Sequence, residues 1–150
     1  MPIIVSTHPR TRKRLDALND VALDDRVQWM KPFGFHDYNK LQMRAFCAIS
    51  DSGTIAEESS MLEFPAITPR DAIERPEGLD VGSLIMTGLN SDTILDAIAA
   101  ITRGFARRES EGHAHPVPTD YCVSNTAERV ANLILGTARL SNNWDGIRKD

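Results

Sequence analysis

Short apolar runs alternate with helix-like segments along most of this chain, and that alternation restricts the fold more than any other feature. The apolar runs occupy residues 2–7, 27–30, 46–50, 65–68 and 83–86. Continuous apolar runs of this length are typical of strands buried in a parallel sheet. Strands that alternate with helices indicate βαβ units, so the sequence predicts an α/β, Rossmann-like fold whose parallel sheet has helices on both faces.

The segments between the apolar runs have the composition of helices. The clearest is residues 91–108, where Ile94, Ile98, Ile101 and Phe105 recur at helical spacing and predict one apolar face. The other expected helices span residues 10–20, 36–45, 54–62 and 125–140, with a loop or short helical turn at 74–82 and a polar, proline-rich connector at 109–122.

Two finer expectations concern the first and last of these helices. Leu15 and Leu18 lie on one face of the 10–20 segment. Asn125 and Glu128 have the Asn-x-x-Glu spacing of a capping box at the start of the last helix.

Composition excludes some classes of partner. The formal net charge of the 150 residues is -4, which argues against a nucleic-acid-binding face. Neither an 18-residue apolar run nor a basic-then-apolar leader occurs, so we expect no membrane association, no signal peptide and a cytoplasmic location. Cys47 lies within an apolar run far from Cys122, which predicts a buried thiol rather than a disulfide.

The stretch SDSGTIAEESS, residues 50–60, lies where the third predicted strand ends and a helix begins. Ligands of open parallel sheets bind outside the carboxyl ends of the strands. Gly53 permits a tight turn, the amides of Gly53, Thr54 and Ile55 would be unpaired helix-start donors, and the Ser52 and Thr54 hydroxyls add further donors. Such a junction favours a phosphate or diphosphate.

A simpler interpretation of the same stretch is a capped helix without a ligand. Thr54 and Glu57 have the spacing of a capping box, which accounts for Glu57 but not for Glu58. Glu58 would point elsewhere and is suited to accept hydrogen bonds from sugar hydroxyls. Both interpretations stay open at this point, although the sequence contains neither a P-loop nor a G-x-G-x-x-G fingerprint.

Residues 50–78, SDSGTIAEESSMLEFPAITPRDAIERPEG, resemble the non-hydrolysing UDP-N-acetylglucosamine 2-epimerases. The family's Asp-Ser-Gly-(Gly/Thr)-x-x-Glu-Glu and Arg-(Asp/Glu)-x-x-Glu-Arg-Pro-Glu pieces are present without gaps. Thr54 and the STHPRT segment at 6–11 look more like the branch that makes UDP-N-acetyl-L-fucosamine. The resemblance covers about residues 2–140.

The resemblance implies the second domain of a two-domain, GT-B-type architecture. Residues 1–150 would form a single C-terminal UDP-binding domain, and the N-terminal catalytic domain would be absent from this chain. The family reaction inverts C2 of a UDP-2-acetamido sugar by elimination and re-addition of UDP, for surface polysaccharide synthesis. By this resemblance the enzyme is an isomerase, and we expect the isolated chain to bind UDP weakly and to be inactive.

The resemblance also implies roles for individual residues at the diphosphate and ribose. Ser52, Gly53 and Thr54 match the residues whose backbone and hydroxyl groups hold the UDP diphosphate. Glu58 matches the glutamate that binds the ribose hydroxyls.

Three further positions match the base pocket and the cleft. Tyr38 matches an aromatic residue that packs on uracil, or it is a half-buried helix aromatic. The backbone around Phe33 would read the base edge. Arg75 matches an arginine at the cleft, or it is an exposed residue, next to Glu74 in the sequence, that forms a surface ion pair.

The histidines give weaker signals. His8, at the carboxyl end of the first strand, could contact a ligand or cap the turn before Pro9. His113 and His115 lack a third ligand in view, so we expect no metal site and no cofactor.

The expected partner is a UDP-sugar, with a homodimer or a separate N-terminal half as a further partner. Two other functions stay open: the nucleotide-sugar-binding domain of a GT-B glycosyltransferase, and a non-catalytic UDP-sugar-binding module.

Overall fold

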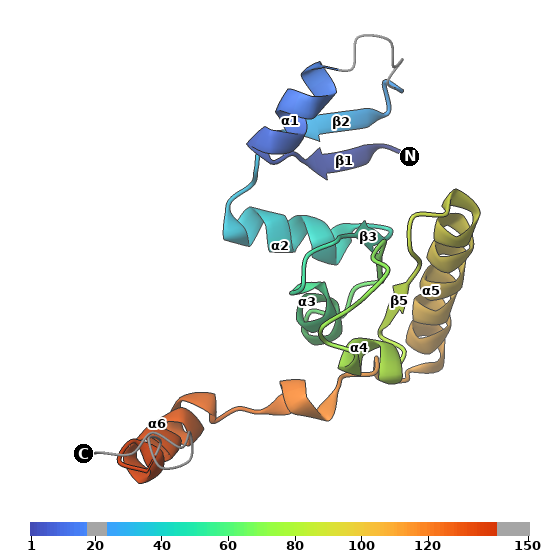
Figure 1. Cartoon of the computed structure of the whole chain (residues 1–150). Helices are drawn as coiled ribbons and strands as arrows, with labels where there is room; N and C mark the ends of the chain where they lie inside the picture. Colours follow the sequence, from blue (N-terminus) through green and yellow to red (C-terminus); the bar gives the residue numbers. More distant parts are fainter. Residues whose placement is uncertain (18–23, 141–150) are drawn as a thin grey trace.

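The structure, a computed structural model, describes residues 1–17 and 24–140 (Figure 1). Each of the five expected strands is present: β1 (Ile3–Ser6), β2 (Val27–Met30), β3 (Ala48–Ile49), β4 (Ala66–Thr68) and β5 (Leu84–Met86). The helices are α1 (Pro9–Asp16), α2 (Phe35–Arg44), α3 (Ile55–Met61), α4 (Glu77–Asp80), α5 (Ser91–Glu111) and α6 (Thr126–Thr137), with a 3-10 turn at Thr119–Cys122.

The strands form two parallel sheets where the sequence suggested one. β1 pairs with β2, and β3, β4 and β5 form a three-stranded sheet in that order. Ile3 lies opposite Val27 in the smaller sheet, and Ala66 lies opposite both Ala48 and Leu84 in the larger one. The α/β class and the parallel pairing are therefore confirmed, while β1 and β3 each keep one edge without a strand among the described residues.

The three-stranded sheet is covered by a helix on each face. Side chains alternate across a strand, so Ala66 and Ile67 of β4 point to opposite faces. Ala66 packs with Ile55 of α3 in one apolar cluster, and Ile67 packs with Ile101 of α5 in the other. Figure 1 shows α3 and α5 on either side of this sheet. The helices on both faces that the sequence predicted are present here.

Helix α5 confirms the predicted apolar stripe. Ile101 and Phe105 are buried against the sheet, and Ile94 and Ile98 are partly buried beside them. Asn90 caps the start of the helix by accepting a hydrogen bond from the Thr93 amide at 2.9 Å. The helix runs three residues past the predicted end.

Strand β1 contradicts the prediction of a buried strand. Ile3 is 54% exposed and Ile4 is 48% exposed. The pattern of the sequence fits a central strand, but β1 has only one neighbouring strand and lacks the two-sided helical cover of β4. Its apolar side chains are therefore half in water, although β1 itself forms at the predicted place.

Strand β3 is also shorter than predicted, with two residues instead of five. Helix α1 ends at Asp16, with Leu15 partly buried, and Leu18 lies outside the described residues. The predicted Asn125 capping box is wrong: the Asn125 side chain does not cap the helix, and its Nδ2 instead donates to Glu128 Oε2 at 3.3 Å.

Both cysteines are free, and Cys47, predicted to be a buried thiol, is partly buried. Burial raises the pKa of the Cys47 thiol to about 11. Within residues 1–17 and 24–140, none of the helices combines the length and apolar character needed to cross a membrane.

Candidate functional site

The loop between β3 and α3 carries a short chain of hydroxyl groups. The Ser52 amide donates to Ser50 Oγ at 3.1 Å. Ser52 Oγ lies 3.0 Å from Thr54 Oγ1, and both residues are exposed. The hydroxyls that the sequence singled out therefore lie together at the carboxyl end of β3, on the solvent side.

The amides of this loop are less free than the sequence predicted. The Ile55 amide donates to the Ser52 carbonyl at 3.3 Å, and the Thr54 amide reaches Ser52 Oγ at 3.4 Å. Both contacts are long and are made within the loop itself, because the loop closes a turn before α3 begins. Within the described part of the chain, only the Gly53 amide of the three predicted donors makes no hydrogen bond.

Glu58 is held from two sides. Thr54 Oγ1 donates to Glu58 Oε1 at 2.7 Å, and Gln42 Nε2 of α2 donates to Glu58 Oε2 at 2.9 Å. The predicted Thr54–Glu57 capping box is wrong, since α3 has no side-chain cap and Thr54 turns to Glu58 instead. Each carboxylate oxygen has further acceptor capacity, so Glu58 is a fixed, partly exposed acceptor.

Glu57 pairs with Arg75 across the loop that follows β4. The Arg75 Nε lies 3.0 Å from Glu57 Oε1, with both side chains partly exposed. Arg75 therefore forms the ion pair that was one of its two predicted roles, and its partner is Glu57. A Cβ added to Gly53 would meet an Arg75 terminal nitrogen at 3.0 Å, so the guanidinium lies directly beside the Gly53 backbone. A glycine at position 53 allows this close approach of the guanidinium, and its φ is not unusual.

Tyr38 of α2 lies beside the same junction. Burial and then the Glu58 carboxylate raise the pKa of the Tyr38 phenol, while a hydrogen bond with Ser50 lowers it. Tyr38 and Gln42 are four residues apart on α2, so they share a face directed at the junction. Sequence reasoning missed Gln42, which is 4% exposed. Its spacing from Tyr38 is the signal that could have found it.

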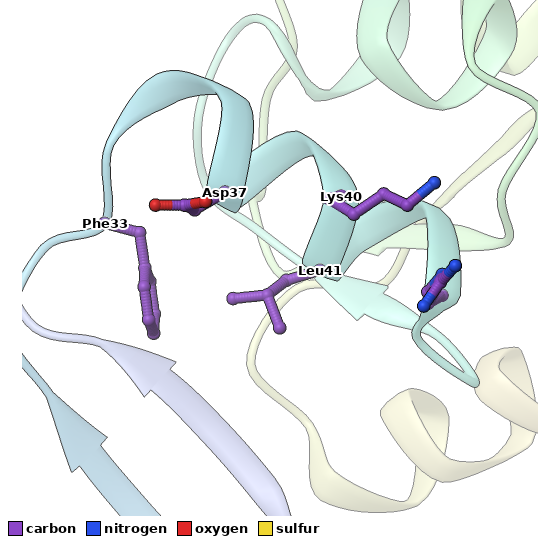
Figure 2. Close-up of a pocket in the computed structure, with 5 residues that line it drawn as sticks. Phe33, Asp37, Lys40 and Leu41 are labelled. Carbon is purple, nitrogen blue, oxygen red and sulfur yellow. The ribbon is translucent and has the colours of Figure 1, made fainter.

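Phe33 lies on another side of α2. It lines an open hollow of about 430 Å³ with Asp37, Lys40, Leu41 and Arg44. Figure 2 shows Phe33 and Leu41 pointing to the same side of α2. The Phe33 side chain is thus part of a hollow separate from the Ser52–Glu58 cluster, and the expectation for its backbone stays a prediction.

His8 adopts the second of its two predicted roles. It is the N-cap of α1, and its Nδ1 accepts a hydrogen bond from the Arg10 amide at 3.2 Å. Among the described residues, no group of three or more His, Cys, Asp or Glu side chains is placed to hold a metal ion.

Tyr121, from the 3-10 turn before α6, lies near the Glu57–Arg75 pair. Burial, then Glu77 and Glu57, raise the pKa of its phenol. The sequence put this residue in a connector and gave no sign of this contact.

Comparison with known proteins assigns this chain to a family. The sequence profile described as UDP-N-acetylglucosamine 2-epimerase matches residues 1–135. This chain belongs to the UDP-N-acetylglucosamine 2-epimerase family. The resemblance drawn from the SDSGT and ERPEG pieces is therefore confirmed at the level of the family.

Solved members of the epimerase family share the fold. A UDP-N-acetylglucosamine 2-epimerase from Rickettsia bellii is 40% identical with a TM-score of 0.80, covering 95% of this chain and 38% of that one. The Methanocaldococcus jannaschii epimerase, solved in complex with UDP-GlcNAc and UDP, is 35% identical with a TM-score of 0.62, covering 67% of this chain and 29% of that one.

Sequence comparison with a characterised relative gives the same family. A UDP-N-acetylglucosamine 2-epimerase of Methanocaldococcus jannaschii is 36% identical over 99 residues, which is 64% of this chain and 27% of the relative. This chain thus spans well under half the length of the epimerases it matches.

Proposed function

We propose that this chain is the UDP-binding half of a sugar-nucleotide 2-epimerase, with residues 1–150 acting as one nucleotide-binding domain. The observation that carries the proposal is the grouping of Ser52, Gly53, Thr54 and Glu58 at the carboxyl end of β3, in a chain 35% identical to an epimerase solved with UDP-GlcNAc and UDP. Open parallel sheets bind their ligands at this end.

The charges at this junction suit the two parts of a nucleoside diphosphate. The Arg75 guanidinium beside Gly53 and the Ser52 and Thr54 hydroxyls would contact the diphosphate oxygens. Glu58, oriented by Thr54 and Gln42, would accept hydrogen bonds from the ribose hydroxyls. The Thr54 hydroxyl would then exchange its bond to Glu58 for one to the ligand.

The base would lie nearer to α2. Tyr38 is half-buried beside Ser50 and Glu58, so its ring would pack against the uracil while the backbone around Phe33 reads the base edge. His8 caps α1 through Nδ1, so its Nε2 would be the nitrogen that contacts the ligand.

The contribution of this half to the reaction would be stabilisation of the departing UDP. When the C1–O bond breaks, negative charge develops on the diphosphate, and preorganised donors there contribute roughly 3 kcal/mol each. Removal of the C2 proton needs a base, which we assign to a catalytic domain outside residues 1–150. The domain alone would therefore bind UDP without turnover.

Two finer assignments belong to the same proposal. Thr54 and the His8–Pro9 segment suggest a substrate of the 6-deoxy kind made by the UDP-N-acetyl-L-fucosamine branch, and synthesis of surface polysaccharides would be the cellular role. A UDP-sugar would be the partner, in the cytoplasm.

Titration of the chain with UDP by calorimetry tests the binding site. We expect saturable millimolar-range binding, weakened about tenfold by Glu58→Gln, which removes the charge that accepts the ribose hydrogen bonds. Ser52→Ala should weaken binding less, because Thr54 and Arg75 would still contact the diphosphate. Glu109→Gln is the matched control, because Glu109 is an exposed carboxylate on α5 away from the junction. Equal weakening by Glu109→Gln, or no binding, would contradict the site.

A product assay separates the epimerase from a glycosyltransferase. The chain would be combined with the rest of a related epimerase and given UDP-GlcNAc without an acceptor. Release of a C2-inverted sugar nucleotide supports the epimerase. Consumption of the substrate only when an acceptor sugar is added would support the glycosyltransferase instead.

A further inference from the structure

Gln42 donates a hydrogen bond from a buried position on α2 to a carboxylate of the candidate site. Its Nε2 lies 2.9 Å from Glu58 Oε2, and the residue is 4% exposed. The bond joins α2 to α3 across 16 positions of the sequence. Glu58 itself is only partly buried. A buried donor therefore holds a carboxylate that solvent, or a ligand, can still reach.

The amide oxygen of the same side chain has no partner. Within residues 1–17 and 24–140, Gln42 Oε1 is a buried atom without a hydrogen bond. A buried polar atom without a partner costs free energy, and an apolar side chain of similar size would avoid that cost. Packing of α2 against α3 therefore does not account for a glutamine here. What the glutamine adds is its Nε2 donor to Glu58.

Thr54 holds the second oxygen of Glu58. Its Oγ1 donates to Glu58 Oε1 at 2.7 Å, so each carboxylate oxygen has one donor from the protein. The terminal torsion of a free glutamate is broad, and a carboxylate oxygen can accept two hydrogen bonds. Two donors fix the plane of the carboxylate and leave one acceptor position open on each oxygen. Two hydroxyls on adjacent carbon atoms fit such a pair of positions.

The two donors differ in how firmly they are held. Thr54 is exposed, and its hydroxyl also lies 3.0 Å from Ser52 Oγ, at the place proposed for the diphosphate. Gln42 is buried and distant from that place in the sequence. When the Thr54 hydroxyl turns to the ligand, Gln42 is the donor that keeps the plane of the Glu58 carboxylate.

We propose that Gln42 is the positioning residue that makes the site select a ribose with both its 2′- and 3′-hydroxyls, an inference that rests on the proposed function. Gln42 acts through Glu58 and does not touch the ligand. With the carboxylate plane fixed, both hydroxyls donate to Glu58 at once. With the plane free to turn, one hydroxyl is accepted nearly as well as two, and the preference for ribose over 2′-deoxyribose falls.

Binding of UDP and of 2′-deoxy-UDP to the whole chain, each measured by chemical-shift titration, tests this selectivity. We expect the unaltered chain to bind UDP about tenfold more tightly, because the deoxy ligand lacks one hydrogen bond to a charged group. Gln42→Leu removes the donor and nearly keeps the size of the side chain. It should weaken UDP binding about fivefold and change 2′-deoxy-UDP binding by less than about twofold, so the ratio falls to about two- to fourfold.

Two control variants separate this role from packing. Gln28→Leu makes the same change at the other glutamine of the chain, which is exposed on β2, and should leave both affinities unchanged. In a Glu58→Gln background, Gln42→Leu should not change the ratio further, because the carboxylate that Gln42 orients is already gone. Circular dichroism of each variant checks that it is folded.

Hydrogen exchange of the side-chain amides gives a measurement that needs no variant. In the chain saturated with UDP, the side-chain amide protons of Gln42 should exchange at least about tenfold more slowly than those of Gln28, because the bond to Glu58 persists. This measurement decides the question even if Gln42→Leu does not fold.

Four results would overturn the inference and leave the proposed function in place. The first is equal binding of UDP and 2′-deoxy-UDP by the unaltered chain. The second is equal weakening of both ligands by Gln42→Leu, which would make Gln42 a packing residue only. The third is no change in either affinity, and the fourth is exchange at Gln42 as fast as at Gln28 in the UDP-bound chain. Absence of UDP binding by the unaltered chain is a different result, which would contradict the proposed function and this inference together.

Discussion

The two sheets of this protein are built from similar apolar runs and yet differ sharply in burial. In β4 the residues Ala66, Ile67 and Thr68 are all buried, at 0 to 1% exposed. In β1 the residues Ile3 and Ile4 are about half exposed. Both runs read as strands of a parallel sheet, and both are strands. What differs is the number of neighbours that each strand has.

The comparison teaches that the burial of a strand is decided outside the strand. β4 has a strand on each edge, with α3 and α5 on its faces. β1 has a strand on one edge, and within the described residues α1 carries no buried residue against it. We call β3, β4 and β5 with α3 and α5 the three-stranded unit, and β1 and β2 with α1 the two-stranded unit. Substitutions inside the three-stranded unit should therefore change the free energy of unfolding most, and substitutions in the two-stranded unit should change it little.

The largest expected contrast is between Phe64 and Ile4. Phe64 is 1% exposed in the cluster with Ile55 and Leu84, so Phe64→Ala should lower the free energy of unfolding by about 3–5 kcal/mol. Ile4→Ala should cost below about 1 kcal/mol, because about half of the side chain is already in water. Urea unfolding followed by circular dichroism measures both.

Trp29 offers a control for that contrast. In a Trp144→Phe background Trp29 alone reports on β2 by fluorescence. If the two units unfold separately, Phe64→Ala should shift the urea midpoint measured by circular dichroism of the helices. The midpoint measured by Trp29 fluorescence should then stay unchanged. Coincident transitions that move together would break the comparison, since they indicate one cooperative unit.

Cysteine reactivity gives the next largest effect. The thiolate is the reactive form, and burial raises the pKa of Cys47 to about 11. Below that pH, its alkylation by iodoacetamide should rise about tenfold per pH unit, and at pH 7.5 it should be roughly 100-fold slower than that of a free cysteine of ordinary pKa. Cys122 is exposed and should react first. Mass spectrometry measures the two rates, and equal rates would show that the larger sheet opens readily.

The same contrast separates what the sequence could predict from what it could not. The Ile94–Phe105 stripe was predictable because helical periodicity depends only on residues within one helix. The five strands were predictable as local apolar runs. Burial of β1 was not, because it depends on a neighbouring strand that no local pattern contains.

The candidate site shows the same division. The grouping of Ser52, Thr54 and Glu58 follows from a loop of a few residues, and the sequence located it. The sequence did not predict the partners of the two glutamates. Glu58 is bound by Gln42 from α2, and Glu57 is bound by Arg75 from beyond β4. The spacing pattern favoured a Thr54–Glu57 box because it contained no information about these distant donors.

A buried hydroxyl pair should give an intermediate effect within the larger unit. Ser83 Oγ donates to the Gly78 carbonyl at 3.1 Å and lies 2.8 Å from Ser60 Oγ. Ser83→Ala should cost about 1–3 kcal/mol, since buried partners lose their hydrogen bond. Ser110→Ala, at an exposed site on α5, is the control. The Ser60→Ala, Ser83→Ala double variant should cost less than the sum of the two single variants in urea unfolding, because the hydroxyls share partners; additivity would contradict the pairing.

The smallest contrast concerns one ion pair in each unit. Glu57 and Arg75 are 30% and 42% exposed, whereas Asp16 and Arg12 on α1 are 62% and 56% exposed. Water screens both pairs, so Glu57→Gln should cost at most about 1 kcal/mol and Asp16→Asn about 0.5 kcal/mol or less. Both costs should shrink in urea unfolding repeated at 0.5 M salt. If Asp16→Asn proved the costlier of the two, the two-stranded unit would be packed more tightly than its exposed strand indicates, and the comparison between the sheets would fail.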